Sequence, residues 1–416
     1  MTGSVVTPRD AGEVRDAVAW SLANATPVEV LGHGSKRAIG RPVQAGLTLD
    51  LSRLAGITLY EPEELVLAAA AGTPLAAIEA ELAAHGQELA FEPMDYGPLL
   101  GGAPDRGTVG GLLAANLAGP RRIKAGAARD HVLGIKAVSG RGEAFKSGGR
   151  VVKNVTGYDL PRTLAGSWGT LAVFTEVTLK VLPRAETETT LVLTGLDAAA
   201  AGRAMRRAMA GPVDVSGAAF LPAPSVATVD ALAALGTSAT LIRLEGVAPS
   251  VEDRLARLGA LLAGLGPVEH LAEAPSRAAW RAVRDVLPLA VPSSDRPVAA
   301  APAGAVVWRV SVAPTAGPAV AAAVTRATAA EALLDWAGGL VWLALAAPGD
   351  DGGAALVRGA VAAAGGGHAT LIRAPAELRA RVPVFEPQPA PLAALAGRLK
   401  AEFDPGGVLN PGRMVL

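Results

Sequence analysis

The spacing of apolar residues predicts alternating helices and strands over the first 185 residues. Apolar side chains at i, i+3, i+4 and i+8 share one face of a helix over 10–23, namely Val14, Ala17, Val18 and Leu22. Short apolar runs predict strands over 28–31, 47–51 and 65–70. Pro74 suits the first turn of a helix that stops at Gly86, and 170–182 alternates as a strand that Pro183 ends.

After Pro183 the pattern changes to strand-then-helix units. Strands are predicted over 189–193, 238–244, 306–312 and 341–345, followed by helices over 198–209, 251–265, 319–330 and 354–364. Further strands are expected over 213–220 and 369–373, and the proline-rich stretch 287–304 is expected to be a surface loop. This pattern predicts a second α/β domain with a mostly antiparallel sheet and helices on one face. One amphipathic helix then precedes a Gly/Pro-rich tail.

Composition narrows the function classes. The 416 residues are 50% hydrophobic and 18% charged, with 38 Lys+Arg against 38 Asp+Glu, so the chain lacks the basic surplus of a nucleic-acid binder. Because there is no cysteine, the chain itself holds no disulfide, iron–sulfur cluster or thiolate zinc site. The five histidines show no ligand spacing, so no metal site is predicted. We expect neither a secretory signal nor a transmembrane segment, and hence a soluble, cytoplasmic protein.

Two glycine-rich segments are candidates for anion binding. The predicted strand 28–31 runs into Gly32-His33-Gly34-Ser35-Lys36, whose successive backbone N–H groups suit phosphate oxygens. It is neither a Rossmann fingerprint, since Arg37 takes the third glycine position, nor a P-loop; an ordinary turn is the alternative. In 107–116, Thr108, Gly110 and Gly111 open a helix of small residues, which suits either an anion or close helix packing. The many other glycines between 101 and 169 also fit hairpin turns.

Several runs are far more specific together than singly. They are Gly46 to Asp50, Gly119 to Arg122, Arg129 to Gly134, Lys153 to Leu160, Gly166 to Leu171, Trp308 to Ser311, Asp335 to Gly339, Gly366 to Thr370 and Asn410 to Met414. With them the chain resembles flavoproteins that carry the vanillyl-alcohol-oxidase type (PCMH-type) of FAD-binding domain. Within that group it is most similar to the FAD-binding E subunits of bacterial glycolate oxidase. The resemblance covers nearly the whole chain.

The resemblance implies an α+β fold in which a two-part PCMH-type FAD-binding domain (1–185) is followed by an α/β cap domain with a mostly antiparallel sheet (186–385). Residues 386–416 would form a C-terminal helix and a tail that returns to the FAD domain. Carried over by position, the loop Gly32, His33, Gly34, Ser35 and Lys36 would hold the pyrophosphate, with Thr108, Gly110 and Gly111 beside it. Ala115 and Asn116 would lie along the ribityl chain and phosphate. Gly126, Arg129 and Val173 would lie near the ribityl chain or the adenosine, and Asn410 would approach the flavin.

The function that the resemblance implies is that of an FAD-dependent subunit of a glycolate oxidase (dehydrogenase) complex, which converts glycolate, a 2-hydroxy acid, to glyoxylate. Its partners would be a D-like flavoprotein subunit and an iron–sulfur F-like subunit, through which the chain would associate peripherally with the inner face of the plasma membrane. Two alternatives stay open. The chain is either a flavin-bearing structural subunit without turnover of its own or a stand-alone FAD oxidoreductase of another hydroxy acid.

Two departures from related proteins bear on how FAD is attached and on whether a catalytic residue can be assigned. Members with a histidyl-flavin bond in this loop carry the histidine where Ser35 stands, and His33 is two residues early, so FAD is expected to be noncovalent. The D subunits resemble a His-x-Gly-Asp-Gly-Asn-x-His pattern that this chain lacks; His368, the nearest feature, is expected to be structural. No catalytic residue is therefore assigned. Arg243, Arg309 and Arg373 on predicted cap strands suit either a substrate carboxylate or surface ion pairs, and ion pairs are favoured.

Overall fold

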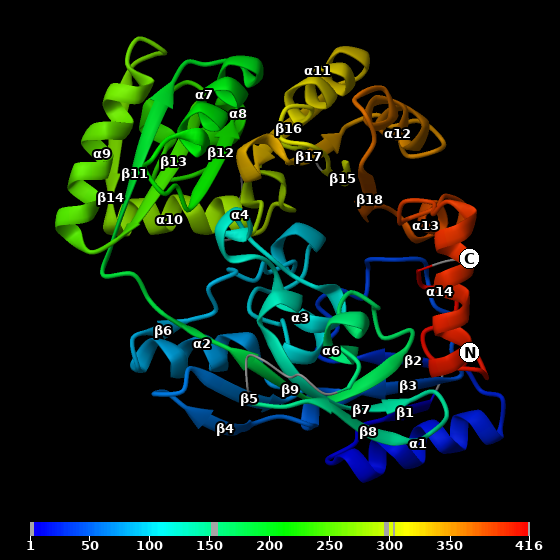
Figure 1. Ribbon diagram of the computed structural model, residues 1–416. Coiled ribbons are helices and arrows are strands. Elements are labelled where there is room, and N and C mark those ends of the chain that lie inside the picture. Colours follow the sequence, from blue (N-terminus) through cyan, green and yellow to red (C-terminus); the bar gives the residue numbers. More distant parts are fainter. Residues whose placement is uncertain (1–3, 151–156, 295–298, 303, 415–416) are drawn as a thin grey trace.

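The chain folds into two stacked lobes in the computed structural model, which describes residues 4–150, 157–294, 299–302 and 304–414 (Figure 1). We call residues 4–184 the basal lobe and residues 187–373 the cap lobe. No helix in these described ranges combines the length and the apolar character that crossing a membrane requires.

The first part of the basal lobe is a small parallel sheet with the strand order β1–β3–β2, formed by Ser4–Val6, Leu47–Asp50 and Val28–Leu31. Helix α1 (Ala11–Ala23) packs on it and begins where the Asp10 side chain accepts a hydrogen bond from the Glu13 N–H. Val14 and Val18 on its predicted apolar face are fully buried. The expected helix and strands of this region are therefore confirmed.

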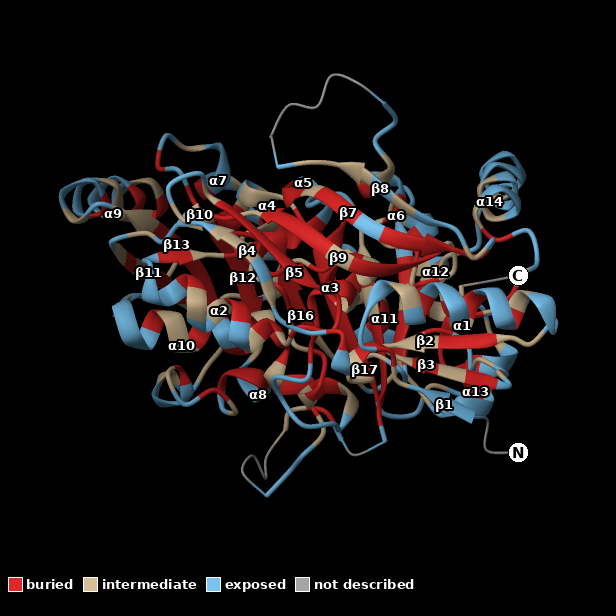
Figure 2. Cartoon of the chain, turned by 90° about the horizontal axis from the view of Figure 1, so that it is seen from below, coloured by how far each residue is buried: buried red, intermediate tan, exposed pale blue. Residues whose placement is uncertain are grey.

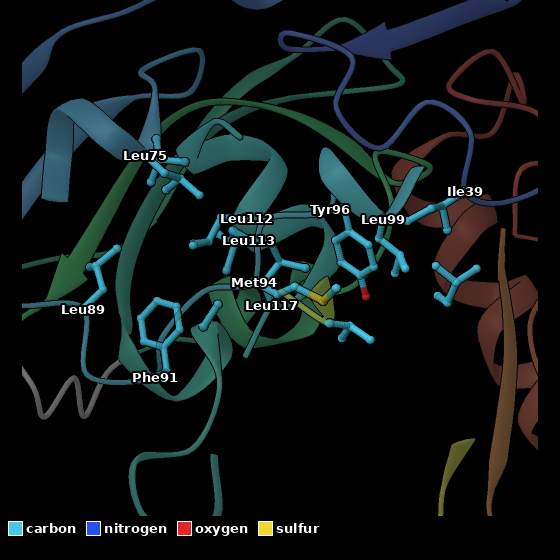
Figure 3. Packing of buried hydrophobic residues seen from close by; sticks show 14 of the residues in the cluster. Ile39, Leu75, Leu89, Phe91, Met94, Tyr96, Leu99, Leu112, Leu113 and Leu117 are labelled. Carbon is cyan, nitrogen blue, oxygen red and sulfur yellow. The ribbon is translucent and has the colours of Figure 1, made fainter. Parts of the chain in front are cut away.

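The second part is a five-stranded antiparallel sheet with the order β4–β5–β9–β7–β8, formed by Ile57–Glu61, Val66–Ala70, Ala172–Lys180, Val132–Ser139 and Ala144–Gly148. Its central strands are mostly buried (Figure 2). Helix α3 (Val109–Ala115) packs against it, and helix α2 (Leu75–Ala84) packs against strand β6 (Gln87–Glu88) and contributes to the same hydrophobic core. Leu112 and Leu113 of α3 gather with Met94 and Leu117 in the core (Figure 3), which fixes the start of α3 near the end of β2.

Shorter elements complete the basal lobe. Strand β6 (Gln87–Glu88) pairs with β10 (Leu182–Pro183), where the chain leaves for the cap lobe. The remaining short helices are α4 (Arg122–Ala125), α5 (Ala128–His131) and α6 (Leu160–Leu164). The run Lys153 to Thr156, which contributed to the resemblance, lies partly in 151–156, outside the described residues.

The cap lobe consists of two βαββαβ units that share one sheet. The first unit is β11 (Thr187–Thr194), α7 (Ala198–Ala210), β12 (Gly217–Leu221), β13 (Ala239–Gly246), α9 (Ala248–Leu262) and β14 (Val268–Ala272). The second is β15 (Val306–Ser311), α11 (Gly317–Ala327), β16 (Ala330–Asp335), β17 (Leu340–Leu345), α12 (Ala354–Ala363) and β18 (His368–Arg373). The antiparallel order β14–β11–β13–β12–β16–β17–β15–β18 gives both units the same strand arrangement, a ferredoxin-like one, with β12 and β16 as the seam.

The two faces of the cap sheet have different neighbours. Helices α7, α9, α11 and α12 cover one face, whereas the other face shares a hydrophobic core with the basal lobe (Figure 1). The prediction that all cap helices lie on one face is wrong for α10 (Glu273–Arg284). This helix buries Ala279, Trp280 and Val283 between the sheet and the basal lobe, because its apolar side fills the space that the two lobes leave.

One expected boundary also differs, and one strand was not expected. The helix predicted over 319–330 ends at Ala327, and Ala330 instead begins β16, which was not predicted. The sequence around Ala332 has high helix propensity, but pairing between β12 and β17 makes it a strand.

The C-terminal segment crosses from the cap lobe back to the basal lobe. Helices α13 (Ala376–Arg381) and α14 (Ala390–Phe403) precede a tail that lies along β2 (Figure 1). The Val28 N–H donates to the Val408 carbonyl at 2.8 Å, and the Asn410 N–H donates to the Val28 carbonyl at 2.9 Å. The tail therefore acts as a further strand-like partner of β2.

Candidate functional site

A pocket open to solvent lies where β2 ends and α3 begins. Eight of the predicted site residues line it, which are Gly32, His33, Gly34, Ser35, Lys36, Thr108, Gly110 and Gly111. The structure thus brings together the two glycine-rich segments, although they are more than seventy residues apart in the sequence.

The glycines let the two pocket loops touch. A Cβ on Gly32 would lie 2.6 Å from the Thr108 hydroxyl oxygen, and one on Gly110 would lie 2.8 Å from the Ala71 Cβ. Both glycines are thus needed for close packing of the chain, and this packing holds the two pocket walls next to each other. Gly34 differs, because its φ of +72° favours glycine and a Cβ there would meet no atom within 4 Å.

Several hydrogen-bond donors of this pocket have no acceptor. Within the described part of the chain, the backbone N–H groups of His33 to Lys36 have no hydrogen-bond partner. Successive free amides of this kind form an anion-binding concavity. The buried His33 Nδ1 likewise has no partner there. Burial lowers the pKa of His33, with a further contribution from Arg106, so this ring is neutral near pH 7.

Two cations face the same pocket. Burial lowers the pKa of Lys36 to about 8, which leaves its amine mostly protonated at pH 7, 3.2 Å from the Ser35 hydroxyl. Burial lowers the pKa of Arg413 to about 10. One guanidinium nitrogen of Arg413 donates to the Lys36 carbonyl at 2.9 Å, while its Nε has no partner among the described residues. Free amides with two buried cations fit a diphosphate group such as that of FAD.

The Asn410 side chain fastens the tail to the pocket wall. Its Oδ1 accepts the Val30 N–H at 2.8 Å, and its Nδ2 donates to the Trp168 carbonyl at 2.8 Å. Trp168 and Gly169 line the pocket, whereas Asn410 itself does not. Its position therefore supports the pocket from behind.

The remaining predicted residues lie outside the pocket lining. Asn116, directly after Ala115 at the end of α3, accepts the Arg129 N–H on its side-chain oxygen at 3.0 Å. Gly126 has φ +83°, and a Cβ there would lie 2.6 Å from the Asp130 carboxylate. Val173 is fully buried in β9, next to the pocket residue Ala172. Their roles toward a cofactor stay predictions.

Among the lining residues that were not predicted are Arg37, Trp168 and Arg413. Arg37 forms a two-point ion pair with the buried Glu29 carboxylate, with nitrogen–oxygen distances of 2.9 and 2.5 Å. Trp168 and Arg413 belong to the runs 166–171 and 410–414 that carried the resemblance, and the Arg413 guanidinium lies 5.7 Å from the Trp168 ring centroid. Their membership in those runs was the signal available in the sequence.

The three cap arginines have three different environments. Arg243 is fully buried, not at the surface as predicted, and binds Glu92 of the basal lobe with two hydrogen bonds of 2.8 Å. Arg373 donates to the carbonyls of Leu99, Leu289 and Ala305, so its expected ion pair is absent among the described residues. Arg309 stacks on Trp336 and Trp342 and has no ion pair in the described ranges. His368, the exposed first residue of β18, lies at an edge of the cap sheet.

A second ion pair also joins the two lobes, but here the arginine belongs to the basal lobe and the carboxylate to the cap lobe. Arg121 of the basal lobe binds Glu245 of the cap lobe and also Glu88, the latter at 2.9 Å. Burial alone would raise the pKa of Glu245, but Arg243 and Arg121 hold it at about 2. The two lobes are therefore joined by ionised, mutually paired side chains.

Asp335 at this interface gives stability a pH dependence. Its carboxylate accepts the Trp336 N–H at 2.7 Å, and burial raises its pKa to about 7 from 3.8. Between these values the folded protein holds a proton that the unfolded chain releases, so stability falls as pH rises toward 7 and stays low above it. At 1.36 kcal/mol per unit the penalty is of order 4 kcal/mol.

We therefore expect Asp335→Asn, which cannot ionise, to be more stable than the parent protein at pH 8, with the gain shrinking as the pH approaches 4. Urea unfolding at pH 4, 6 and 8 measures this. An equal difference at all three values would contradict the assignment.

Comparison with known proteins agrees with this geometry. Residues 3–148 match the family model of the FAD binding domain. The fold is similar to that of p-cresol methylhydroxylase, with a TM-score of 0.72 at 15% identity over 99% of this chain and 88% of that one. The fold and the pocket define a flavoprotein with a PCMH-type FAD-binding domain. The chain is 34% identical over 399 residues to the glycolate oxidase subunit GlcE of Escherichia coli (strain K12), covering 96% of this chain and 95% of that protein. It belongs to the family of that glycolate oxidase subunit.

A second relative is more distant. The glycolate oxidase subunit GlcD of Bacillus subtilis (strain 168) is 27% identical over 267 residues, which covers 63% of this chain and 55% of that protein. The cofactor of this chain is FAD.

Proposed function

We propose that this chain is the FAD-binding subunit of a complex that oxidises glycolate to glyoxylate. The observation that supports the proposal is the pocket at the end of β2, where four free backbone amides, Lys36 and Arg413 lie together in a member of this family and could bind a diphosphate. A 2-hydroxy acid loses a hydride from its α-carbon and a proton from its hydroxyl group on oxidation, and FAD bound there would carry the two electrons of that hydride within the complex.

Each part of the pocket has a proposed task. The 32–36 loop would bind the pyrophosphate through its amides, with Lys36 and Arg413 neutralising charge and Thr108, Gly110 and Gly111 closing the opposite wall. Ala115, Asn116, Gly126, Arg129 and Val173 would follow the ribityl chain and the adenosine, and Asn410 would hold the tail toward the flavin. In the same proposal residues 1–185 form the FAD domain, 186–385 the cap, and 386–416 the returning segment.

The partners follow from what the sequence lacks. With no cysteine in the chain, electrons bound for an acceptor other than a nicotinamide need an iron–sulfur cluster on another subunit, the F-like one. The histidine-rich run of the D subunits is also missing, so a D-like flavoprotein subunit would oxidise the substrate. We propose a cytoplasmic complex that associates with the inner face of the plasma membrane through these partners.

Co-purification tests the proposal. The tagged chain should retain FAD and two further subunits, one flavoprotein and one iron–sulfur protein, and the assembly should reduce an artificial electron acceptor with glycolate. The chain purified alone should hold FAD but turn over glycolate far more slowly. Full turnover by the isolated chain would contradict the division of labour, and an assembly inactive with glycolate would contradict the proposed function.

The mode of FAD attachment gives a separate prediction. Because His33 is two residues before the position of the flavin-linked histidine in related proteins, acid precipitation should release all the flavin into the supernatant, measured by its absorbance. A yellow pellet would show a covalent bond. His33→Ala should leave this release unchanged, which separates noncovalent contact from attachment at this residue.

A further inference from the structure

A cleft opens on the outer face of the cap lobe, where the two βαββαβ units meet. It is lined by α7 and α11, which cover that face of the cap sheet, and by β12 and β16 at the seam (Figure 1). None of its lining residues lines the FAD pocket. A ligand bound in this cleft would therefore leave the cofactor pocket free.

The seam opens because the two strands that form it hardly pair. Strands β12 and β16 are in register only at Phe220 and Leu334, whereas every other pair of adjacent strands in this sheet matches over at least five residues. Two residues after Phe220, Pro222 has no N–H to donate to a neighbouring strand, which ends the pairing. Residues 330–332 of β16 consequently line the cleft instead of pairing with β12.

Helices α7 and α11 touch beside this opening without filling it. A Cβ on Gly202 of α7 would lie 2.6 Å from the Pro318 ring of α11, so the two helices are in close contact there. Phe220 and Pro222 give the cleft an apolar wall. The helices line the rest of it largely with small side chains, which are Ala198, Ala199, Ala321 and Ala322. A space with small and apolar walls admits a compact ligand.

Oppositely charged side chains line the cleft without pairing. Glu331 accepts the Ser225 hydroxyl at 2.6 Å, but no cation pairs with it in the described ranges. Burial raises the pKa of Glu331, and a bound cation would offset this by favouring the ionised form. Arg326, exposed near the end of α11, likewise has no acidic partner in the part of the chain that the structure describes. The cleft thus offers one group for a cation and another for an anion.

The first turn of α7 adds hydrogen-bond donors. The N–H groups of Ala198 and Ala199 have no acceptor among the described residues, whereas the Asp197 side chain accepts the Ala200 N–H at 2.7 Å. Free amides at a helix N-terminus favour a negatively charged group. An anion in the cleft therefore has these amides as well as Arg326 as donors, and Asp197 is a second carboxylate for a cation.

We infer that this cleft binds a free α-amino acid with a small apolar side chain, a function separate from the proposed one. The ligand ammonium group would bind Glu331, its carboxylate would bind Arg326, and its side chain would lie on Phe220 and Pro222. A guanidinium and a carboxylate side chain each form strong, charge-assisted hydrogen bonds with such groups. A simple carboxylic acid would leave Glu331 without a partner, and a simple amine would leave Arg326 without one.

Calorimetric titration of the FAD-loaded protein with L-valine tests the inference. Isovalerate, which lacks the amino group, and isobutylamine, which lacks the carboxylate, are the matched ligands. L-valine should bind saturably, and each analogue at least about tenfold more weakly, the range for losing a hydrogen bond to a charged group. Glycine should also bind more weakly than L-valine, because it leaves the apolar wall uncovered.

Variants of the cleft test the same contacts from the side of the protein. Glu331→Gln keeps a side-chain oxygen but loses the charge, and should weaken L-valine binding at least about tenfold, as should Arg326→Gln. Ala322→Leu, which fills the cleft, should abolish saturable binding. Glu252→Gln on α9 and Arg203→Gln on α7 change exposed side chains outside the cleft, and these matched controls should bind like the parent protein.

The outcomes that overturn the inference are distinct. A parent protein that does not bind L-valine saturably overturns the site, as does binding that is unchanged in both charge variants. An analogue that binds as tightly as L-valine overturns the need for both charges, and glycine binding as tight overturns the apolar side chain. FAD content and melting temperature show that each variant is folded. Because Arg326 is exposed, Arg326→Gln keeps the test decisive if Glu331→Gln does not fold.

Discussion

Arg243→Met should lower the free energy of unfolding by about 3–5 kcal/mol, because breaking a buried ion pair leaves an uncompensated charge. Arg243 is 1% exposed, and its removal would take two hydrogen bonds from the Glu92 carboxylate of the basal lobe and leave Arg121 as the remaining partner of Glu245. The side chain also lies 4.5 Å from the Trp280 ring centroid, so methionine keeps part of the packing but none of the charge. Urea unfolding followed by tryptophan fluorescence measures the change.

Two further variants make this result specific. Arg257→Met removes an ion pair with Asp253 in which both side chains are more than half exposed, and should change stability by no more than about 1 kcal/mol. Adding Glu92→Leu to Arg243→Met should restore part of the loss, because the stranded carboxylate is then gone. If Arg243→Met is no less stable than Arg257→Met, the ion pairs between the lobes do not hold the lobes together.

Gly32→Val should produce a protein that purifies without most of its FAD. The new Cβ would lie 2.6 Å from the Thr108 hydroxyl oxygen, so the two loops that form the pocket would be pushed apart. We expect at least a hundredfold loss of FAD affinity, measured by fluorescence titration of the flavin-free protein and by the flavin-to-protein absorbance ratio after purification.

Gly259→Ala is the matched control, because a Cβ added at this α9 glycine would meet no atom within 4 Å and its backbone conformation is an ordinary one. It should gain about 0.4–1 kcal/mol of stability and bind FAD normally. In the Gly32→Ala background, Thr108→Ala should recover part of the FAD binding by making room. Normal FAD content in Gly32→Val would place the cofactor somewhere other than this pocket.

The fold was predictable where local patterns decide it. Helix α1 with its Asp10 cap, and α2 after Pro74, follow from periodicity and end signals alone. Strand β16 could not be found this way, because its alanine-rich sequence favours a helix and only pairing with β12 and β17 makes it a strand. The position of α10 was equally hidden, since an amphipathic helix shows that it has an apolar face but not which surface covers it.

The site was predictable in part for a similar reason. Glycine spacing located both pocket loops, but it did not reveal that Gly32 is needed for contact with Thr108, a residue far along the chain. The three cap arginines look alike in sequence, yet Arg243 forms a buried ion pair, Arg373 donates to carbonyl groups and Arg309 stacks on tryptophan. What separates them is tertiary contact, which no local pattern encodes.

The returning tail has a consequence for how the holoprotein is made. Arg413 lines the pocket beside the 32–36 loop, where it donates to the Lys36 carbonyl, and Asn410 fastens the tail to Val30 across 380 positions of the sequence. A nascent chain that has emerged from the ribosome only as far as β18 therefore has the sheets of both lobes but lacks the tail residues of the pocket. We expect cofactor capture to follow synthesis of the polypeptide through residue 413, and stalled nascent chains that end at Phe403 to stay colourless.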